Sequence, residues 1–198
     1  MIQPIQTIEQ GSLPIHIYET PEAMGAASAE SLAHQQIALA AEQNTVGFLI
    51  MAAPSAFGFY RAYLNRAKED AALQAALART HFFQFDDYPL PADHPATFRY
   101  LLNEHFFNAL TQWCPRENIH PFNVDAADPD QVCSDYTRHV LESGLDIQLK
   151  GVGENGHWGF HEPGIPLDSE PRYRSVELSE ENALQQLRDH PDLFTSPE

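Results

Sequence analysis

A glycine-rich stretch from Gly151 to Gly164 carries the densest group of side chains that could do acid–base chemistry. It holds Asn155, His157, His161 and Glu162 among five glycines. Glycine permits positive φ angles and a close approach of a ligand to the backbone. Histidine changes its charge near neutral pH, and a carboxylate can orient the imidazole and stabilise its charged form. The stretch therefore indicates a general acid/base pair in a loop.

Three other interpretations of this stretch stay open. A G-x-G-x-x-G pattern after a strand is typical of dinucleotide binding, but Gly156, Gly159 and Pro163 all oppose the helix that should follow it. On a helix, His157 and His161 would share a face and could bind zinc, which the same residues disfavour. His157 could also simply form a hydrogen bond with a carbonyl of its own loop.

Two adjacent carboxylates, Asp86 and Asp87, follow a predicted strand, His81–Phe85. Such a pair can bind a divalent cation, cap the following loop or supply a general base. In a parallel sheet, ligands bind beyond the carboxyl ends of the strands, so this pair and the glycine-rich loop would share one rim. Their combination favours the general-base interpretation.

The elements that position these residues alternate between short apolar runs and longer helical stretches. Strands are predicted at 14–19, 46–52, 81–85, 118–122, 145–150 and 172–178. Helices are predicted from Thr20-Pro21 to about 42, from an N-cap at Ser55, from 95 to about 110, from a capping box at Asp128 to 143, and after Ser179. Strand–helix alternation predicts an α/β fold with a largely parallel sheet and helices on both faces, in one domain over residues 1–198.

Composition limits the partners of the protein. Eleven Lys and Arg against 28 Asp and Glu give a net charge of −17, which argues against nucleic acid and anionic membranes. The N-terminus has no pattern of a signal peptide, and no apolar run is long enough to span a bilayer. Cys114 and Cys133 match no metal or redox spacing, so we expect a cytoplasmic protein.

Together, Phe85-Asp86-Asp87-Tyr88, the later His94-Pro95 and the glycine-rich stretch resemble the glucosamine-6-phosphate deaminases. The patterns of that family are F-x-x-D-E-Y and G-x-G-x-[ND]-G-H-x-x-F-N-E-P, in the same order and strand context. The wider superfamily includes 6-phosphogluconolactonase, but the Phe160…Glu162-Pro163 ending is more similar to the deaminases. The resemblance implies a Rossmann-like, doubly wound sheet, and it requires no metal or organic cofactor.

The resemblance also implies roles for individual residues. Asp86 would move a proton between C2 and C1 of an open-chain amino sugar phosphate. His157, with Asn155 and Glu162, would assist ring opening. The product would be a ketose phosphate, with release of ammonia.

Four further positions would contact the phosphosugar by the same resemblance: Ser55, Asp87, Gly153 and Arg188. Ser55 follows the second predicted strand, where it could replace the last hydroxyl of a phosphate-binding loop. Arg188 matches a phosphate-binding arginine of the family. Members range from monomers to hexamers, so a homo-oligomer is possible.

The sequence departs from the family pattern at several places. Ala52-Ala53-Pro54-Ser55 stands where the family has T-G-[GS]-T-P, and Pro54 has no N–H to offer a phosphate. Asp87 and His161 stand where Glu and Asn are usual. Lys150 falls in a strand expected to be buried, so its ammonium must reach solvent or a partner. The family's closing strand, helix and phosphate-binding lysine have no counterpart, as in a fragment. A lactone hydrolase and a non-catalytic sugar-phosphate-binding protein are the alternatives.

Overall fold

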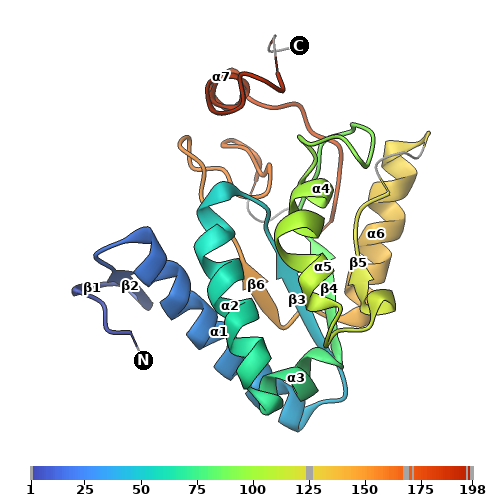
Figure 1. The fold of residues 1–198 in the computed structure, drawn as a ribbon. Helices are drawn as coiled ribbons and strands as arrows, with labels where there is room; N and C mark the ends of the chain where they lie inside the picture. The colour runs from blue at the N-terminus through green and yellow to red at the C-terminus, as the bar shows by residue number, and fades with distance from the viewer. Residues whose placement is uncertain (1, 124–126, 167–169, 171, 195, 197–198) are drawn as a thin grey trace.

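The protein is built around a parallel four-stranded β-sheet (Figure 1). The computed structural model describes residues 2–123, 127–166, 170, 172–194 and 196. The strand order is β5–β4–β3–β6, with β3 (Val46–Ile50) and β4 (Thr80–Gln84) in the centre. The outer strands are β5 (Ile119–His120) and β6 (Ile147–Leu149). Each neighbouring pair runs parallel, which confirms the predicted α/β class.

Helices cover both faces of the sheet because both faces of its central strands are apolar. Successive side chains of a strand point to opposite faces, so Phe48 and Ile50 of β3 lie in a large core while Leu49 lies in a smaller one. The helices on the large core are α1 (Pro21–Glu42), α2 (Phe57–Glu69), α3 (Ala71–Leu77), α4 (Phe98–Leu102) and α5 (Asn108–Leu110). The smaller core packs against α6 (Pro129–Ser143).

Local capping fixes where the helices begin. Thr20 accepts a hydrogen bond from the amide of Ala23 at the start of α1, and Asp128 accepts one from Gln131 at the start of α6. Ser179 does the same for the amide of Asn182 in the last helix, α7 (Glu180–Asp189). These caps satisfy amides that have no partner within the helix. The predicted starts of all three helices are confirmed.

Two short strands form a separate antiparallel hairpin before α1. They are β1 (Gln6–Gln10) and β2 (Leu13–Ile17). The strand predicted at 14–19 corresponds to β2, but it belongs to this hairpin and not to the central sheet. Figure 1 shows the hairpin in dark blue, standing to one side of the sheet.

Two predicted helices are wrong in detail. Ser55 is not an N-cap, because it lies inside a 3₁₀ turn, Pro54–Ala56, that leads into α2. The helix predicted over 95–110 begins at Phe98, and a π-helical segment, Asn103–Phe107, separates α4 from α5. Phe106 and Phe107 of that segment lie in the large core.

The strand predicted over 172–178 is also wrong, because none of those residues is in a strand. Tyr173 instead fastens this segment to the sheet, since its hydroxyl donates a hydrogen bond to the carbonyl of Gln84 at 3.2 Å. Lys150 lies just beyond β6 and is exposed, with its ammonium 4.9 Å from the ring centre of Trp158. The expected burial of Lys150 does not occur, because β6 is an outer strand here.

None of the helices in the described ranges combines the length and the apolar character that a bilayer span requires.

Candidate active site

Asp86 and Asp87 lie at the carboxyl end of β4, but their surroundings differ. Asp87 is tied to the protein by four donors. Its Oδ1 accepts from the amides of Tyr88 and Phe98, each at 2.8 Å. Its Oδ2 accepts from the Arg99 amide at 3.0 Å and from the Gln84 side chain at 2.7 Å. Asp87 therefore holds the start of α4 against the end of β4, as a capping carboxylate does.

Asp86 faces a cavity of about 960 Å³. Burial and the neighbouring negative charge of Asp87 raise its pKa to about 8. A carboxyl with such a pKa exchanges a proton close to neutral pH, which suits a general base. The same cavity is lined by Tyr88 and by Trp158, Phe160 and His161 of the glycine-rich loop.

The glycine-rich loop follows β6 and contains no helix. Gly156 and Gly159 have φ angles of 92° and 53°, and Phe160 has a φ of 52°. The backbone therefore turns repeatedly, so no helix starts there to receive a dinucleotide pyrophosphate. His161 stacks on Trp158 and its Nε2 lies 3.2 Å from the Ile165 carbonyl. Within the part of the chain that the structure describes, no group of three metal-binding side chains has an arrangement that could hold an ion.

A chain of hydrogen bonds links His157 to Glu162 through Asn155. The Nδ1 atom of His157 lies 2.6 Å from Oδ1 of Asn155, whose Nδ2 donates to Glu162 at 2.9 Å. Since the Asn155 oxygen can only accept, Nδ1 of His157 carries the proton. In the neutral imidazole, Nε2 is then left with a lone pair for a reaction partner.

Gly153 leaves the space that the imidazole ring of His157 occupies. A Cβ atom at this position would lie 2.1 Å from Cε1 of His157, which is far inside contact distance. The Gly153 amide also donates to the His157 carbonyl at 2.8 Å. Only glycine allows the ring of His157 to lie against the backbone here. The described contacts give Gly153 a part in positioning His157; its predicted contact with substrate stays a prediction.

Glu162 is held as a carboxylate at the N-terminus of α7. Burial would raise its pKa, but hydrogen bonds from Asn182, Asn155 and Ser179 outweigh this effect and lower its pKa below the ordinary value. Asn182 donates to Glu162 at 2.7 Å. The N-terminus of a helix also favours a negative charge. Glu162 therefore orients Asn155 without taking up a proton near neutral pH.

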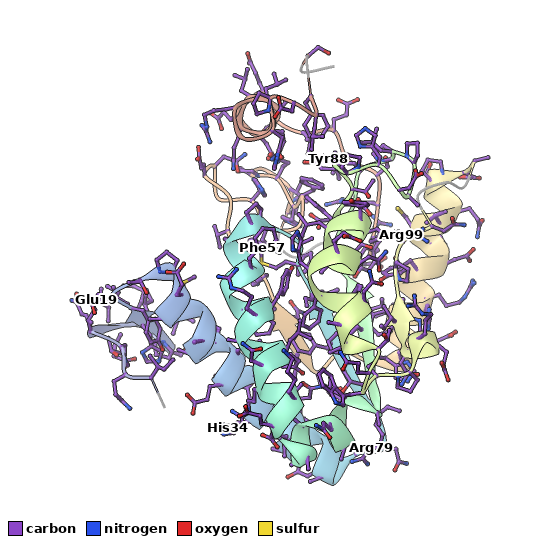
Figure 2. The ribbon with its side chains drawn as sticks, in the orientation of Figure 1. Glu19, His34, Phe57, Arg79, Tyr88 and Arg99 are labelled. Carbon is purple, nitrogen blue, oxygen red and sulfur yellow. The ribbon has the colours of Figure 1, made fainter. Side chains whose placement is uncertain are left out.

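Aromatic contacts join the loop after β4 to the glycine-rich loop. The ring centre of Tyr88 lies 5.2 Å from that of Phe160 and 5.5 Å from that of Phe194. Phe160 also stacks on Phe98 at the start of α4. Figure 2 shows Tyr88 between α4 and the last helix, α7. The structure thus brings the Asp86 loop and the His157 loop to the same rim of the sheet.

Of the predicted site residues, only Asp86 and Asp87 line this cavity; Ser55, Gly153, Asn155, His157, Glu162 and Arg188 do not. Ser55 is exposed in the turn after β3, and it is not among the residues that line the cavity. Arg188 of α7 forms an exposed ion pair with Glu154, 2.7 Å apart. This pair ties α7 to the glycine-rich loop a second time. Contacts of either residue with a phosphate remain a prediction.

Sequence reasoning missed Gln84 and Asn182. Gln84 is buried and donates to the Asp87 carboxylate, and Asn182 is buried and donates to Glu162. For Asn182 a signal existed, because it stands at the third position after the N-cap Ser179. For Gln84 the only signal was a polar residue between the aromatic residues Phe83 and Phe85.

Known proteins are similar to this chain in sequence. A deaminase from Shouchella clausii (strain KSM-K16), named glucosamine-6-phosphate deaminase, is 33% identical over 140 residues, covering 70% of this chain and 54% of that protein. One of the same name from Phocaeicola vulgatus is 31% identical over 124 residues, covering 62% of this chain and 45% of that protein. The chain therefore spans about half the length of these relatives.

Solved structures agree in fold. A monomeric glucosamine-6-phosphate deaminase superposes with a TM-score of 0.73 at 24% identity, covering 90% of this chain and 68% of that one. The 6-phosphogluconolactonase of Thermotoga maritima gives a TM-score of 0.58 at 19% identity, covering 68% and 58%. The family model described as glucosamine-6-phosphate isomerases/6-phosphogluconolactonase matches residues 19–159, well over half of the sequence. The chain belongs to the glucosamine-6-phosphate isomerase/6-phosphogluconolactonase family.

Proposed function

We propose that the protein converts a hexosamine 6-phosphate into a ketose 6-phosphate and ammonia, as in glucosamine 6-phosphate plus water giving fructose 6-phosphate plus ammonia. One observation carries the proposal. A half-buried carboxyl with its pKa near 8, Asp86, opens into a cavity that Trp158, Phe160 and His161 of the glycine-rich loop also line. The deaminase name of the relatives supports the same reaction.

Asp86 is the proposed base for the isomerisation. In the open-chain sugar, its carboxylate removes the proton from C2, next to the C1 aldehyde, while the C1 oxygen takes a proton from water, and an enolamine forms. The resulting carboxylic acid returns the proton to C1, and the iminium group left at C2 gives a proton back to the hydroxide, which leaves an imine. Water then adds to the imine and releases ammonia, so atoms and charge balance. A carboxyl that accepts and then returns a proton works best when its pKa lies near the working pH.

His157 is the proposed acid/base for ring opening. Its Nδ1 proton is held by Asn155, so Nε2 can take the proton of the anomeric hydroxyl and deliver one to the ring oxygen. Glu162 stays ionised and fixes Asn155, which keeps the imidazole in this orientation. Asn155 and Glu162 therefore position the imidazole of His157 for both proton transfers.

Phosphate binding is proposed at the turn after β3 and at Arg188. The backbone of Ala53 is extended, with a φ of −164°, and Pro54 follows it. The turn therefore offers fewer amides than a glycine-rich loop does. Binding of phosphate by Arg188 would require this side chain to leave Glu154. Breaking this ion pair costs little free energy, because exposed ion pairs contribute little to stability.

Ammonium release from glucosamine 6-phosphate tests the reaction and the base together. We expect turnover by the parent chain and a loss of at least a hundredfold in Asp86→Asn. Asp93→Asn is the matched control, because Asp93 lies exposed in the same loop. Full turnover by Asp86→Asn would remove Asp86 from the mechanism. No ammonium from the parent, with hydrolysis of a sugar lactone instead, would overturn the deaminase proposal.

A further inference from the structure

His161 lines the cavity into which Asp86 opens, whereas His157 does not. The glycine-rich loop, which the structure describes over its whole length, contributes three side chains to this cavity: Trp158, Phe160 and His161. An indole can only donate a hydrogen bond, and a phenyl ring has no polar atom. His161 is therefore the side chain of this loop that can accept a hydrogen bond from a molecule in the cavity.

The hydrogen bond of the His161 ring determines which of its two nitrogens is free. Its Nε2 lies 3.2 Å from the carbonyl oxygen of Ile165. Since a carbonyl oxygen can only accept, Nε2 carries the proton of the neutral imidazole, and Nδ1 keeps a lone pair. Among the described residues, none donates a hydrogen bond to Nδ1. The ring thus offers an acceptor that the protein itself does not use.

Trp158 fixes the orientation of this acceptor. The indole and the imidazole of His161 stack with their ring centres 4.9 Å apart and their planes at 1° to each other. The amide of His161 also donates to the carbonyl of Trp158 at 2.9 Å. The ammonium of Lys150 lies 4.9 Å from the centre of the same indole and adds a cation–π contact. Lys150 and His161, which both depart from the family pattern, therefore contact one indole, and the imidazole is oriented before a ligand binds.

The proposed reaction brings a nitrogen donor into this cavity. Asp86 is proposed to remove the hydrogen from C2 of the sugar, and the amino group is bonded to that same carbon. The neighbouring carboxylate of Asp87 already accepts four hydrogen bonds from the protein. The lone pair of an imidazole accepts from the N–H of an amine, and this hydrogen bond is stronger when the amine is charged. The free Nδ1 of His161 is therefore suited to the amino group.

We propose that Nδ1 of His161 accepts a hydrogen bond from the C2 amino group of the sugar phosphate and thereby selects an amino sugar. The inference rests on the proposed deamination and adds the residue that recognises the group to be released. No bond forms or breaks at His161, so its role is specificity and not proton transfer. A site built to bind a substrate N–H rejects an analogue without it, because the polar atom of the site is then left unpaired.

Equilibrium binding of two unreactive analogues tests the proposal. Both are open-chain alditol 6-phosphates, one with an amino group at C2 and the other with only hydrogen there, and neither can isomerise because each lacks a carbonyl group. We expect the parent chain to bind the amino compound roughly 10- to 100-fold more tightly, which is the range of one charge-assisted hydrogen bond. His161→Phe, which keeps a ring to stack on Trp158, should remove this preference. His34→Phe, at an exposed histidine of α1, is the matched control and should keep it.

The two analogues together separate recognition from a structural defect. A variant that disturbs the loop would weaken the binding of both compounds by the same factor, whereas a lost hydrogen bond weakens only that of the amino compound. Equal losses in His161→Phe, or a preference that persists there, would overturn the assignment to His161. Ammonium release by the parent chain together with such a result would contradict this inference alone. No ammonium release and no binding of either compound would overturn the proposed function, and this inference with it.

Discussion

At the scale of single residues, the candidate site contains two carboxyl groups, Asp86 and Glu162, whose pKa values are shifted in opposite directions. Burial and the charge of Asp87 raise the pKa of Asp86, while hydrogen bonds from α7 lower that of Glu162. The two environments thus separate the carboxyls into a proton-exchanging group and a permanent anion. Pairs of titratable groups pushed apart in this way are typical of acid–base sites.

The raised pKa of Asp86 has a consequence for stability. Below about pH 4 this carboxyl is protonated in both the folded and the unfolded chain. Between that pH and about 8 only the unfolded chain loses the proton, so the burial of Asp86 costs more stability as the pH rises. Asp86→Asn should therefore stabilise the protein more at pH 8 than at pH 5, by up to about 1.4 kcal/mol per pH unit.

Urea unfolding of the parent and of Asp86→Asn at pH 5, 6, 7 and 8 measures this difference. Asp93→Asn, on the exposed part of the same loop, should show no such trend. A constant difference between the parent and Asp86→Asn across this range would mean that the carboxyl titrates normally.

Gly153 gives a second prediction at this scale. Gly153→Ala places a methyl group 2.1 Å from the ring of His157, so the imidazole must move away from Asn155. We expect turnover to fall at least tenfold with little change in melting temperature. Gly151→Ala is the control, because its methyl group would meet only the flexible end of Met51. Ammonium release by both variants measures the effect, and equal activity of the two would contradict the positioning role of Gly153.

At the scale of elements, α7 is attached to the glycine-rich loop by one buried contact and one exposed contact. The buried contact joins Asn182 to Glu162, and the exposed one joins Arg188 to Glu154. Removing a partner of a buried charged group costs about 1–3 kcal/mol, whereas an exposed ion pair contributes about 0–1 kcal/mol. Asn182→Ala should therefore release α7, and Glu154→Ala should not.

Hydrogen exchange at the amides of residues 180–189 distinguishes these two variants. We expect at least tenfold faster exchange in Asn182→Ala and near-parental exchange in Glu154→Ala. Asn182→Ala should also lose activity, since Glu162 would no longer hold Asn155 in place. The reverse order of the two variants would show that the exposed ion pair carries the attachment.

The elements predicted well from the sequence are those whose ends are set by neighbouring residues. Thr20-Pro21 and Asp128-Pro129 start α1 and α6 because cap and proline act within one turn. The start of α4 was misplaced because part of its cap, Asp87, comes from eleven residues away. The site follows the same rule. Its motifs predict Asp86 and His157, whose roles stay predictions, while the contacts of Gln84 and Asn182 arise only when distant segments meet in the fold.

At the scale of the whole molecule, the charge of −17 opposes the approach of an anionic phosphosugar. Enzymes that attract a charged substrate lose association rate as salt is added, because salt screens the attraction. This chain should show the opposite sign, because its net charge of −17 outweighs the local positive charges of Arg172 and Arg174 in the cavity. We expect kcat/KM for glucosamine 6-phosphate to rise about two- to fivefold between 10 and 150 mM ionic strength, where the screening length shortens from about 30 to 8 Å.

Steady-state ammonium release at constant pH and increasing NaCl measures this dependence. Unphosphorylated glucosamine, with no phosphate charge to repel, serves as the control substrate at high protein concentration, and its turnover should not rise with salt. A fall of kcat/KM with salt would show that a local cationic site governs binding. Arg172→Gln, Arg174→Gln and Arg188→Gln would then identify the cation responsible, because Arg172 and Arg174 line the cavity and Arg188 lies on α7. The sign of the salt effect therefore decides whether the acidic surface or the site itself controls access of the substrate.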